Sequence, residues 1–514
     1  MGKQITSVII AGGGSAGWMS AIYLNRVFQR LSSPIKITVI EPENIPTIGV
    51  GEATVPMIRQ FFQSLGIPEV ELMIKTDATL KSGIKFVDWI DEGDGGYYHP
   101  FEAPVFSDGI TIGEHWLAKA HLNTGSSSSF AHDTGIVASL CDANKILKPL
   151  SATNYDGPLS YAYHLDATKV AVHLKSLALQ AGVVCVSDEI TTVEVSETES
   201  IASLQTTKSG NLKADFYIDC TGFASLLMGA ISDNDENFVS YKDELLCDSA
   251  VTLQTPARSN QTGELRSYTT ATAKSSGWIW EIDLPTRTGN GYVYSSQHCD
   301  KEAAEEELAK HLGLERSSQS FNHLKFKVGR RKQFWKNNCL TIGLSSGFLE
   351  PLESTGLQFI EMGLRIFFDF LPTQDVSKSL IRRYNDTIAE MYDDTKDFIA
   401  LHYILSARKD SQFWTDIQKI KISQNLKERL ALWKGKYPSS IDFPLHAMFN
   451  HVNYLYILLG MKRFDLVGGA RVESINMQSS DRILEDMQNI AQNAVKTSIS
   501  HEEFIERIRA PFGL

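Results

Sequence analysis

The first fifty residues alternate between short apolar runs and a helical pattern. Residues 7–11 form an apolar run of strand length, and a glycine-rich turn follows at 12–17. Apolar residues then recur at helical spacing over 18–28, and a second apolar run, 35–40, ends at Glu41. Strand, turn, helix and strand in this order predict a βαβ unit with parallel strands.

The pattern changes further along the chain. Residues from about 80 to 150 are irregular and rich in Gly, Ser and aromatic side chains, which is typical of long functional loops or an insertion. Residues 250–298 alternate as an antiparallel sheet does, and beyond residue 357 the pattern is helical almost to the end. These periods predict an α/β fold with an antiparallel sheet and a helical C-terminal part.

The glycine-rich turn points to dinucleotide chemistry. Its glycines allow a tight turn, close approach of a pyrophosphate and close packing of helix on strand, while the helix N-terminus attracts phosphates. Glu41, 24 positions after Gly17, would accept a hydrogen bond from a ribose hydroxyl. A structural turn is the alternative, but strand, helix and acid all agree with adenine dinucleotide binding. The candidate contacts are Gly12, Gly14, Ser15, Ala16, Gly17 and Glu41.

Two later segments repeat the strand-and-turn pattern. For residues 214–222 an ordinary strand and turn is the better interpretation. Residues 338–347 lead through Gly343 and Gly347 toward another helix, whose backbone N–H groups suit a flavin edge or a small anion. The alternative for Glu353, just before that helix, is a solvated acid favoured by the helix dipole.

Several single residues have an ordinary structural interpretation. Lys81 by itself is most simply a solvated surface lysine, and Trp278 and Trp280, on one face of a strand, are most simply core residues. His99 and Phe101 either line a pocket or pack a loop. The 13 histidines show no ligand spacing, so we predict no metal site.

Composition narrows the possible function classes. The chain has 514 residues, 43% of them hydrophobic, and a net charge of −12, which is typical of a globular protein. We therefore expect no nucleic-acid partner and no membrane partner, and no apolar run approaches the ~20 residues of a membrane span. The six cysteines lie far apart without paired spacing, which favours a cytoplasmic location.

Taken together, these motifs resemble those of the flavin-dependent halogenases, in particular the branch that acts on tryptophan and indoles. The resemblance runs from Gly12 to about Gly460. A general flavin hydroxylase would share the glycine-rich start but not Lys81 or the double-tryptophan strand. The signatures stand in the family's order: the glycine-rich start ending in Gly-Trp, the segment 49–56, Lys81 before Ile84-Lys85-Phe86, the strand with Trp278 and Trp280, and the segment 350–356.

The resemblance implies an FAD-binding two-dinucleotide fold of the glutathione-reductase type. We expect this FAD module over residues 1–360, with substrate-side segments at about 80–150 and 250–298 interleaved in it. Residues 361–514 would form a helical cap that completes the substrate site. Beyond the glycine-rich turn, the expected FAD contacts are Val50, Ala53, Gly343 and Gly347.

The resemblance also implies a mechanism. Reduced FAD, delivered by a separate flavin reductase, reacts with O₂ to give a flavin hydroperoxide, which a halide attacks to yield hypohalous acid. The acid is relayed to Lys81, whose ammonium group donates hydrogen bonds to it or carries it as a haloamine. Glu353 orients the electrophile and accepts the proton that leaves the arene. Thr355 and Gly356 offer backbone amides to the halide.

The substrate-side residues depart from the family pattern. The small aromatic substrate is expected to contact His99, Phe101, Phe449 and Tyr454. Tryptophan halogenases tend to carry a tryptophan where Tyr454 stands, and a glutamate for the substrate amino group where we find Phe449. We therefore predict indole or a related electron-rich arene as substrate, not free tryptophan. Asp283 breaks the end of the double-tryptophan box, with little effect expected on oxidant formation.

Two other functions stay open at this point. The protein would be a flavin monooxygenase if product formed without halide and carried added oxygen. It would be a flavin-binding protein without halogenating activity if Lys81 could be replaced without effect. A homo-oligomer is compatible with the sequence.

Overall fold

The computed structural model describes residues 5–29, 35–43, 51–107, 109–122, 129–152, 154–371 and 377–513. Val50 lies outside these residues, so its expected role in FAD binding stays a prediction. Each of two units gathers three separate stretches of the chain. Unit 1 comprises Met1–Asp77, Leu165–Lys242 and Phe326–Tyr392, and unit 2 comprises Ala78–His164, Asp243–Lys325 and Asp393–Leu514.

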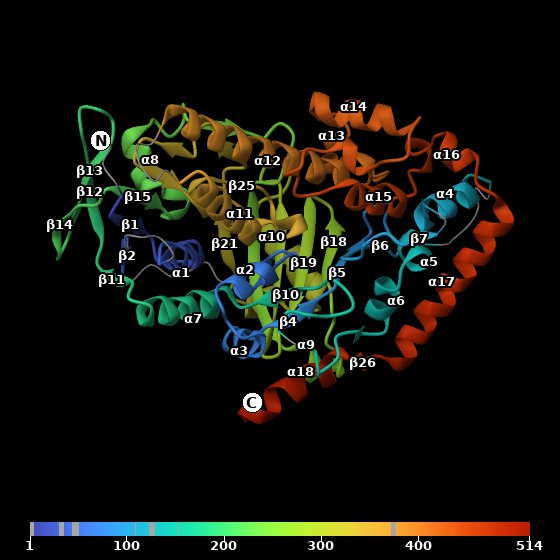
Figure 1. Cartoon of the computed structure of the whole chain (residues 1–514). Coiled ribbons are helices and arrows are strands. Elements are labelled where there is room, and N and C mark those ends of the chain that lie inside the picture. Colours follow the sequence, from blue (N-terminus) through green and yellow to red (C-terminus); the bar gives the residue numbers. More distant parts are fainter. Residues whose placement is uncertain are drawn as a thin grey trace. The chain divides into compact units, whose positions relative to one another are not determined.

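The predicted βαβ unit is confirmed at the start of unit 1. Strand β1 (Ser7–Ala11) pairs in parallel with β2 (Lys36–Glu41), and helix α1 (Ser15–Phe28) connects the two strands. Neighbouring strands extend the sheet in the order β11-β2-β1-β15-β24-β23 (Figure 1). The added strands are β11 (Val184–Ser187), β15 (Phe216–Asp219), β24 (Cys339–Thr341) and the antiparallel β23 (Trp335–Lys336).

The core of unit 1 lies on both faces of this sheet. Helix α1 packs against α7 (Ala167–Gln180), and α8 (Leu226–Ile231) contacts β15 and β24. Because both faces are covered, the strands are apolar along almost their whole length, as parallel strands usually are. The carboxyl ends of β1, β2, β15 and β24 therefore meet at one edge, which is where ligands bind in this class of sheet.

The predicted antiparallel sheet is confirmed in unit 2. Its strand order is β21-β17-β20-β19-β18-β5-β6. Strands β17 to β20 pair with antiparallel neighbours, whereas β5 (Gly83–Val87) joins β18 in parallel. The other strands are β17 (Ser249–Pro256), β18 (Thr269–Lys274), β19 (Gly277–Asp283), β20 (Arg287–Tyr294), β21 (Asn322–Lys325) and β6 (Tyr97–Pro100).

The interpretation of residues 80–150 as long loops is wrong, whereas the alternative of an insertion agrees with the division into units, in which Ala78–His164 separates two stretches of unit 1. This stretch supplies strands β5 and β6 to the sheet of unit 2 and also forms several helices. Glycines at 93, 95 and 96 separate elements that are each too short to show a clear period. The remaining elements include β4 (Thr79–Lys81), α4 (Ile112–Leu122), α5 (Phe130–Thr134) and α6 (Val137–Asp142).

The helical pattern predicted beyond residue 357 is confirmed. Helix α11 (Gly356–Asp369) belongs to unit 1, and α15 (His451–Gly460) and α17 (Met477–Thr497) belong to unit 2. The long helix α17 runs beside α4, α5 and α6 (Figure 1). None of the described helices is both long and apolar enough to cross a membrane.

Candidate active site

The glycine-rich turn of unit 1 has no room for side chains at two of its positions. Gly12 has a φ of +106°, and a Cβ on it would come 2.2 Å from the carbonyl oxygen of Cys220. A Cβ on Gly17 would come 1.8 Å from the carbonyl oxygen of Gly12. By contrast, a Cβ on Gly14 would meet nothing within 4 Å. The turn is therefore tight on its inner side and open on the side where the helix begins.

The N-terminus of α1 is suited to an anion. Gly14 is the N-cap residue and supplies no side chain, and the first turn contains no acidic residue. The hydroxyl of Ser15 donates to the carbonyl oxygen of Ala167 at 3.4 Å. The first backbone N–H groups of a helix have no partner inside it and carry positive partial charge. This geometry fits the pyrophosphate of a dinucleotide such as FAD.

Glu41 lies against the glycine-rich turn at the end of β2. A Cβ on Gly13 would come 2.0 Å from its Oε2 atom, so the carboxylate reaches the turn directly. Trp18 Nε1 donates to the same oxygen at 3.1 Å, and Lys175 pairs with Oε1. The hydrogen bond that Lys175 donates to Glu41 raises the pKa of Lys175. A ribose contact for Glu41 stays a prediction.

A second small-residue turn touches the first. Gly343 follows strand β24 with a φ of +76°, and a Cβ on it would come 2.7 Å from Cβ of Ala16. Gly347 then opens the short strand β25 (Gly347–Phe348), and Ala53 lies half-buried in β3 (Glu52–Ala53). Two of the expected cofactor residues, Ala16 and Gly343, are thus neighbours although they are far apart in the sequence.

The strand at 214–222 has the ordinary role that its sequence favoured. Asp219, at the end of β15, is fully buried. Its Oδ2 accepts from the backbone N–H groups of Leu227 and Met228, both at 2.9 Å. Asp219 therefore caps the N-terminus of helix α8, which is a structural role.

Glu353 is buried, so its interpretation as a solvated acid is wrong. It ends a short turn of 3₁₀ helix, Pro351–Glu353, and has no exposed surface. Ser354, with a φ of +61°, then reverses the chain into Thr355 and the start of α11. No side chain caps this helix start, and Gly356 is exposed. The amides of Thr355 and Gly356 therefore suit a small anion.

Lys81 is also buried, which excludes its interpretation as a surface charge. It is the last residue of β4 and has no exposed surface. Its Nζ atom lies 5.2 Å from the ring centroid of Phe101, within reach of a cation–π contact. Lys81 thus presents a desolvated cation to an aromatic ring of the same unit.

His164 was missed by the sequence interpretation and belongs to the surroundings of Lys81. Strand β10 (Ala162–Leu165) pairs with β4 and places His164 opposite Thr79. Burial, and then the charge of Lys81, lower the pKa of His164 well below its usual value, so its ring is neutral. The ring nitrogens lie 3.2 Å from Thr79 Oγ1 and 2.8 Å from Thr269 Oγ1. The apolar neighbours of His164 in the run 162–165 could have indicated that this histidine is buried.

Three of the predicted substrate contacts, His99, Phe449 and Tyr454, each lie against the ring of Phe398. His99 is buried, and its Nε2 lies 3.0 Å from Nδ2 of Asn453, which the sequence interpretation had not singled out. Phe449 stacks on Phe398 with ring centroids 4.2 Å apart. Tyr454 has no exposed surface and packs among other aromatic rings, and its substrate role stays a prediction.

The double-tryptophan strand is core, as its ordinary interpretation stated. Trp278 and Trp280 are 1% and 6% exposed, and their ring centroids are 6.1 Å apart. The departure at Asp283 has a structural reason. Its two carboxylate oxygens accept from Nη2 and Nε of Arg266, both at 2.8 Å, in a buried bidentate pair.

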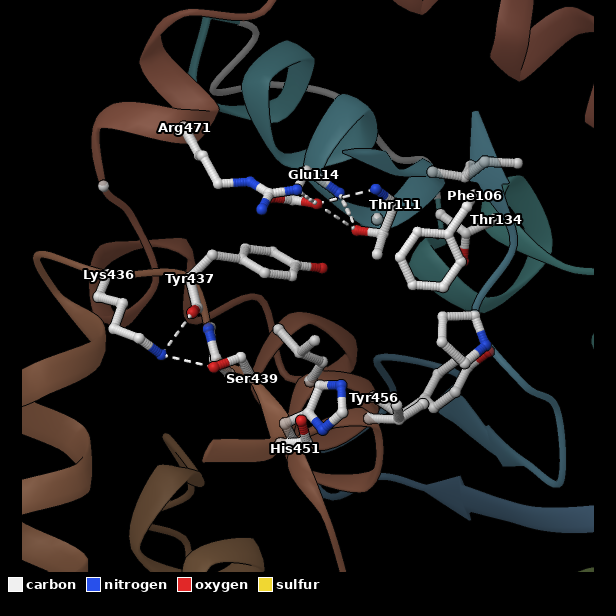
Figure 2. Close-up of a pocket in the computed structure, with 18 of the residues that line it drawn as sticks. Phe106, Thr111, Glu114, Thr134, Lys436, Tyr437, Ser439, His451, Tyr456 and Arg471 are labelled. Atoms are coloured by element: carbon white, nitrogen blue, oxygen red, sulfur yellow. Dashed lines mark hydrogen bonds and ion pairs between the residues drawn. The ribbon is translucent and has the colours of Figure 1, made fainter. Parts of the chain in front are cut away.

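A cavity of about 410 Å³ lies within unit 2. Its walls come from the start of α4, from α5, from the first turns of α15 and from two loops (Figure 2). The apolar part of its wall includes Phe106 and Phe130. Polar atoms come from Tyr437, His451 and Tyr456. None of His99, Phe101, Phe449 and Tyr454 is among the lining residues. In the described residues, no group of three or more His, Cys, Asp or Glu side chains could hold a metal ion.

Comparisons with known proteins extend over almost the whole chain. A family model described as tryptophan halogenase matches residues 7–467. The chain is 35% identical to a tryptophan 6-halogenase of Streptomyces toxytricini, over 97% of each chain. It is 32% identical to a tryptophan 7-halogenase of Lentzea aerocolonigenes, over 99% of each. A solved flavin-dependent halogenase from Brevundimonas sp. BAL3 is 32% identical, with a TM-score of 0.88, over 98% of this chain and 99% of that one.

Proposed function

Because the chain belongs to the tryptophan halogenase family, we propose a substrate for it. This substrate is indole or a related electron-rich arene, and not L-tryptophan bound through its ammonium group. The protein is a flavin-dependent halogenase that uses reduced FAD, O₂ and a halide, and a separate flavin reductase supplies the reduced FAD. The buried Lys81 beside Phe101 is the observation that carries the proposed site.

The glycine-rich turn would hold the cofactor. Gly12, Gly14 and Gly17 leave space and free N–H groups for the pyrophosphate, with Ser15 and Ala16 beside them. Gly343, packed on Ala16, continues this surface, and Ala53, Val50 and Gly347 are further proposed contacts. Bound FADH₂ supplies, with O₂, the oxidising equivalents that convert halide into an electrophilic halogen. The amides of Thr355 and Gly356, at the uncapped start of α11, are the proposed halide ligands.

Lys81 and Glu353 are the proposed catalytic residues. The ammonium group of Lys81 donates hydrogen bonds to the oxygen of the halogen oxidant, and burial strengthens these bonds. The ring of the arene supplies the electron pair for the new carbon–halogen bond and then loses a proton. Glu353, which is also desolvated, accepts this proton and restores the aromatic ring.

The proposed substrate carries no ammonium group because the acidic side chain that lines the cavity of unit 2 is already paired. Of the described side chains that line it, only Glu114 is acidic. Its Oε1 pairs with Arg471 Nε at 2.7 Å, and its Oε2 accepts from the backbone N–H and the hydroxyl of Thr111. A substrate ammonium group would therefore have to break an existing ion pair to find a partner. Phe449, where the family tends to carry a glutamate, offers no charge.

The net charge and the cysteines bear on nucleic-acid binding and on location. We propose no nucleic-acid partner, because the net charge is −12. All six cysteines lie in the described part of the chain as free thiols, which supports a reducing cytoplasm as the location.

One assay tests the proposal. The protein is incubated with FAD, a flavin reductase, NADH and O₂, and chloride, bromide or iodide is offered with indole, substituted indoles or L-tryptophan. Mass spectrometry should show the isotope pattern of a halogen on an indole ring, and only when halide is present. A product that forms without halide and carries oxygen would instead establish a monooxygenase.

A further inference from the structure

The cavity in unit 2 has apolar walls and a mouth at the surface. Phe130 is buried in the wall, whereas Phe106, also in the wall, is 62% exposed. Val452 and Leu455 of α15 complete the apolar surface. Figure 2 shows the ring of Tyr437 reaching across the middle of the cavity, with His451 and Tyr456 on the side below it. A volume of about 410 Å³ lies in the range of sites for small organic ligands.

The charges around the cavity already compensate one another. Arg471 pairs with Glu114 at 2.7 Å, and Lys436 pairs with Asp442 at 2.8 Å. Both basic side chains line the cavity, but each has an acidic partner. A charged ligand group would have to compete with these pairs, and a neutral ligand group would not.

The polar atoms that remain are neutral hydrogen-bonding groups. The Nδ1 atom of His451 is buried and has no hydrogen-bond partner among the described residues. Burial lowers the pKa of His451, so its ring is neutral at pH 7. Burial also raises the pKa of the Tyr456 hydroxyl well above its usual value, so this group stays protonated. An imidazole and phenols can serve both the N–H and the C=O of an amide.

The cavity lies one side chain away from the proposed arene contacts. The rings of Tyr456 and His99 have centroids 6.1 Å apart, and Tyr456 lines the cavity. His99 and Phe101 are two positions apart at the end of β6, and Phe101 faces Lys81. All these residues belong to unit 2. Phe101, His99 and Tyr456 thus connect Lys81 with the cavity.

We propose that this cavity is a subsite for the side chain of a 3-substituted indole that carries a neutral amide or acyl group. The inference rests on the proposed function, because the indole ring itself is assigned to the His99 and Phe101 side. The apolar walls take the alkyl part, and His451, Tyr437 and Tyr456 take the amide. The enzyme should therefore select neutral acylated indoles over indoles with an ammonium group.

Three substrates and four proteins test this inference. Indole, tryptamine and N-acetyltryptamine are brominated by the wild type and by Val452→Trp, Tyr437→Phe and Val172→Trp, and kcat/KM is measured. Val452→Trp fills the cavity, whereas Val172 is 64% exposed on α7 and gives the same substitution outside it. Wild type should prefer N-acetyltryptamine to tryptamine by about tenfold or more, which is the usual effect of a pocket contact. In Val452→Trp the ratio of kcat/KM for N-acetyltryptamine to that for indole should fall by about tenfold.

Tyr437→Phe should lower the same ratio by a few-fold, and Val172→Trp should keep the wild-type ratio. If Val452→Trp does not fold, Gly113→Ala replaces it. A Cβ on Gly113 would come 2.5 Å from the Tyr437 hydroxyl and 3.3 Å from the Phe130 ring, so it displaces the cavity wall. An unchanged ratio in the folded cavity variants, or equal use of tryptamine and N-acetyltryptamine by the wild type, would overturn the subsite.

A binding measurement separates this inference from the proposed function. Calorimetric titration with N-acetyltryptamine needs neither flavin nor halide. Binding to wild type that is lost in Val452→Trp supports the subsite even if no halogenated product is ever formed, a result that would count against the proposed function. Halogenation of indole without any effect of the cavity variants would reject the subsite and keep the function.

Discussion

The cofactor region of unit 1 and the Lys81 region of unit 2 are built in different ways. The cofactor region is made of backbone: Gly12 and Gly17 are tight against carbonyl oxygens, and the start of α1 carries no cap. The Lys81 region is made of side chains from separate strands and helices, among them His164 and Asn453. The first kind of site tolerates few changes in shape, whereas the second kind depends on particular functional groups.

This difference explains how a family can keep one chemistry and change its substrate. A backbone cradle binds the same cofactor whatever side chains surround it. A side-chain site can exchange single contacts, as we predict for Phe449, while Lys81 stays in place. Substitutions in the Lys81 region should therefore lower the rate of catalysis, whereas substitutions in the cofactor region should weaken FAD binding. The following variants test this difference.

Lys81→Ala should have the largest effect. Removing the buried ammonium group should lower kcat about 1,000-fold or more, because its hydrogen bonds to the oxidant are lost. The affinity for FAD should stay within about twofold of wild type. Lys419→Ala, at a lysine whose side chain is 66% exposed, is the matched control and should be fully active. Halogenation at the wild-type rate in Lys81→Ala would remove Lys81 from the mechanism.

Glu353→Gln should have the next largest effect. An amide cannot accept the arene proton, and loss of a general base commonly costs about 100-fold to 1,000-fold in kcat. Single-turnover rates with bromide and indole measure this loss. Glu503→Gln, at a side chain that is 45% exposed on α18 (His501–Arg509), provides a control at an acid with no proposed role. A proportional loss of FAD affinity in Glu353→Gln would indicate a structural role instead.

Two alanine variants in the glycine-rich turn distinguish a loss of FAD binding from a loss of stability. Gly17→Ala should weaken FAD binding about 100-fold and lower the melting temperature, because its Cβ would come 1.8 Å from a carbonyl oxygen. Gly14→Ala meets nothing within 4 Å, so the melting temperature should not change. Its FAD affinity should still fall about tenfold, because the methyl group occupies the side on which we place the pyrophosphate. Flavin fluorescence and thermal unfolding measure both effects, and equal behaviour of the two variants would contradict the proposed cradle.

Glu361→Gln should have the smallest effect on activity, because it should act on stability instead. Burial raises the pKa of Glu361 on α11 from 4.5 to about 7, and Arg365 opposes this rise. The folded state thus keeps a proton that the unfolded state loses, so this residue lowers the free energy of unfolding as pH rises from 4.5 to 7. The variant should be about 2–3 kcal/mol more stable than wild type at pH 8, with almost no difference at pH 4. Urea unfolding at the two pH values checks the sign, and a constant difference would exclude the titration of Glu361.

The sequence predicted those parts of the molecule whose signals are contiguous. The βαβ unit could be recognised because strand, turn, helix and acid follow one another within residues 7–41. The antiparallel strands at 250–298 were recognisable for the same reason. The elements within 80–150 were missed, since each is short and pairs with a strand far away, as β5 does with β18.

Apart from the glycine-rich turn, the candidate site was predictable only where motifs from the family resemblance named its residues. Nothing local shows that Lys81 is buried, because its burial requires strand β10 and the ring of Phe101. The contact of Asn453 with His99 joins residues far apart in the chain, and no spacing rule connects them. The cavity likewise draws on α4, α5 and α15, so it could be found only in the folded structure.

The most direct test of the account is a competition between indole and L-tryptophan. Both are present at equal concentration with bromide, FAD, a flavin reductase and O₂, and mass spectrometry measures the two brominated products over time. We expect bromoindole to exceed bromotryptophan by about tenfold or more, because Glu114, the one acidic side chain among the described residues that line the cavity, is already paired with Arg471. An excess of bromotryptophan that disappears when the amino group is acylated would contradict the account.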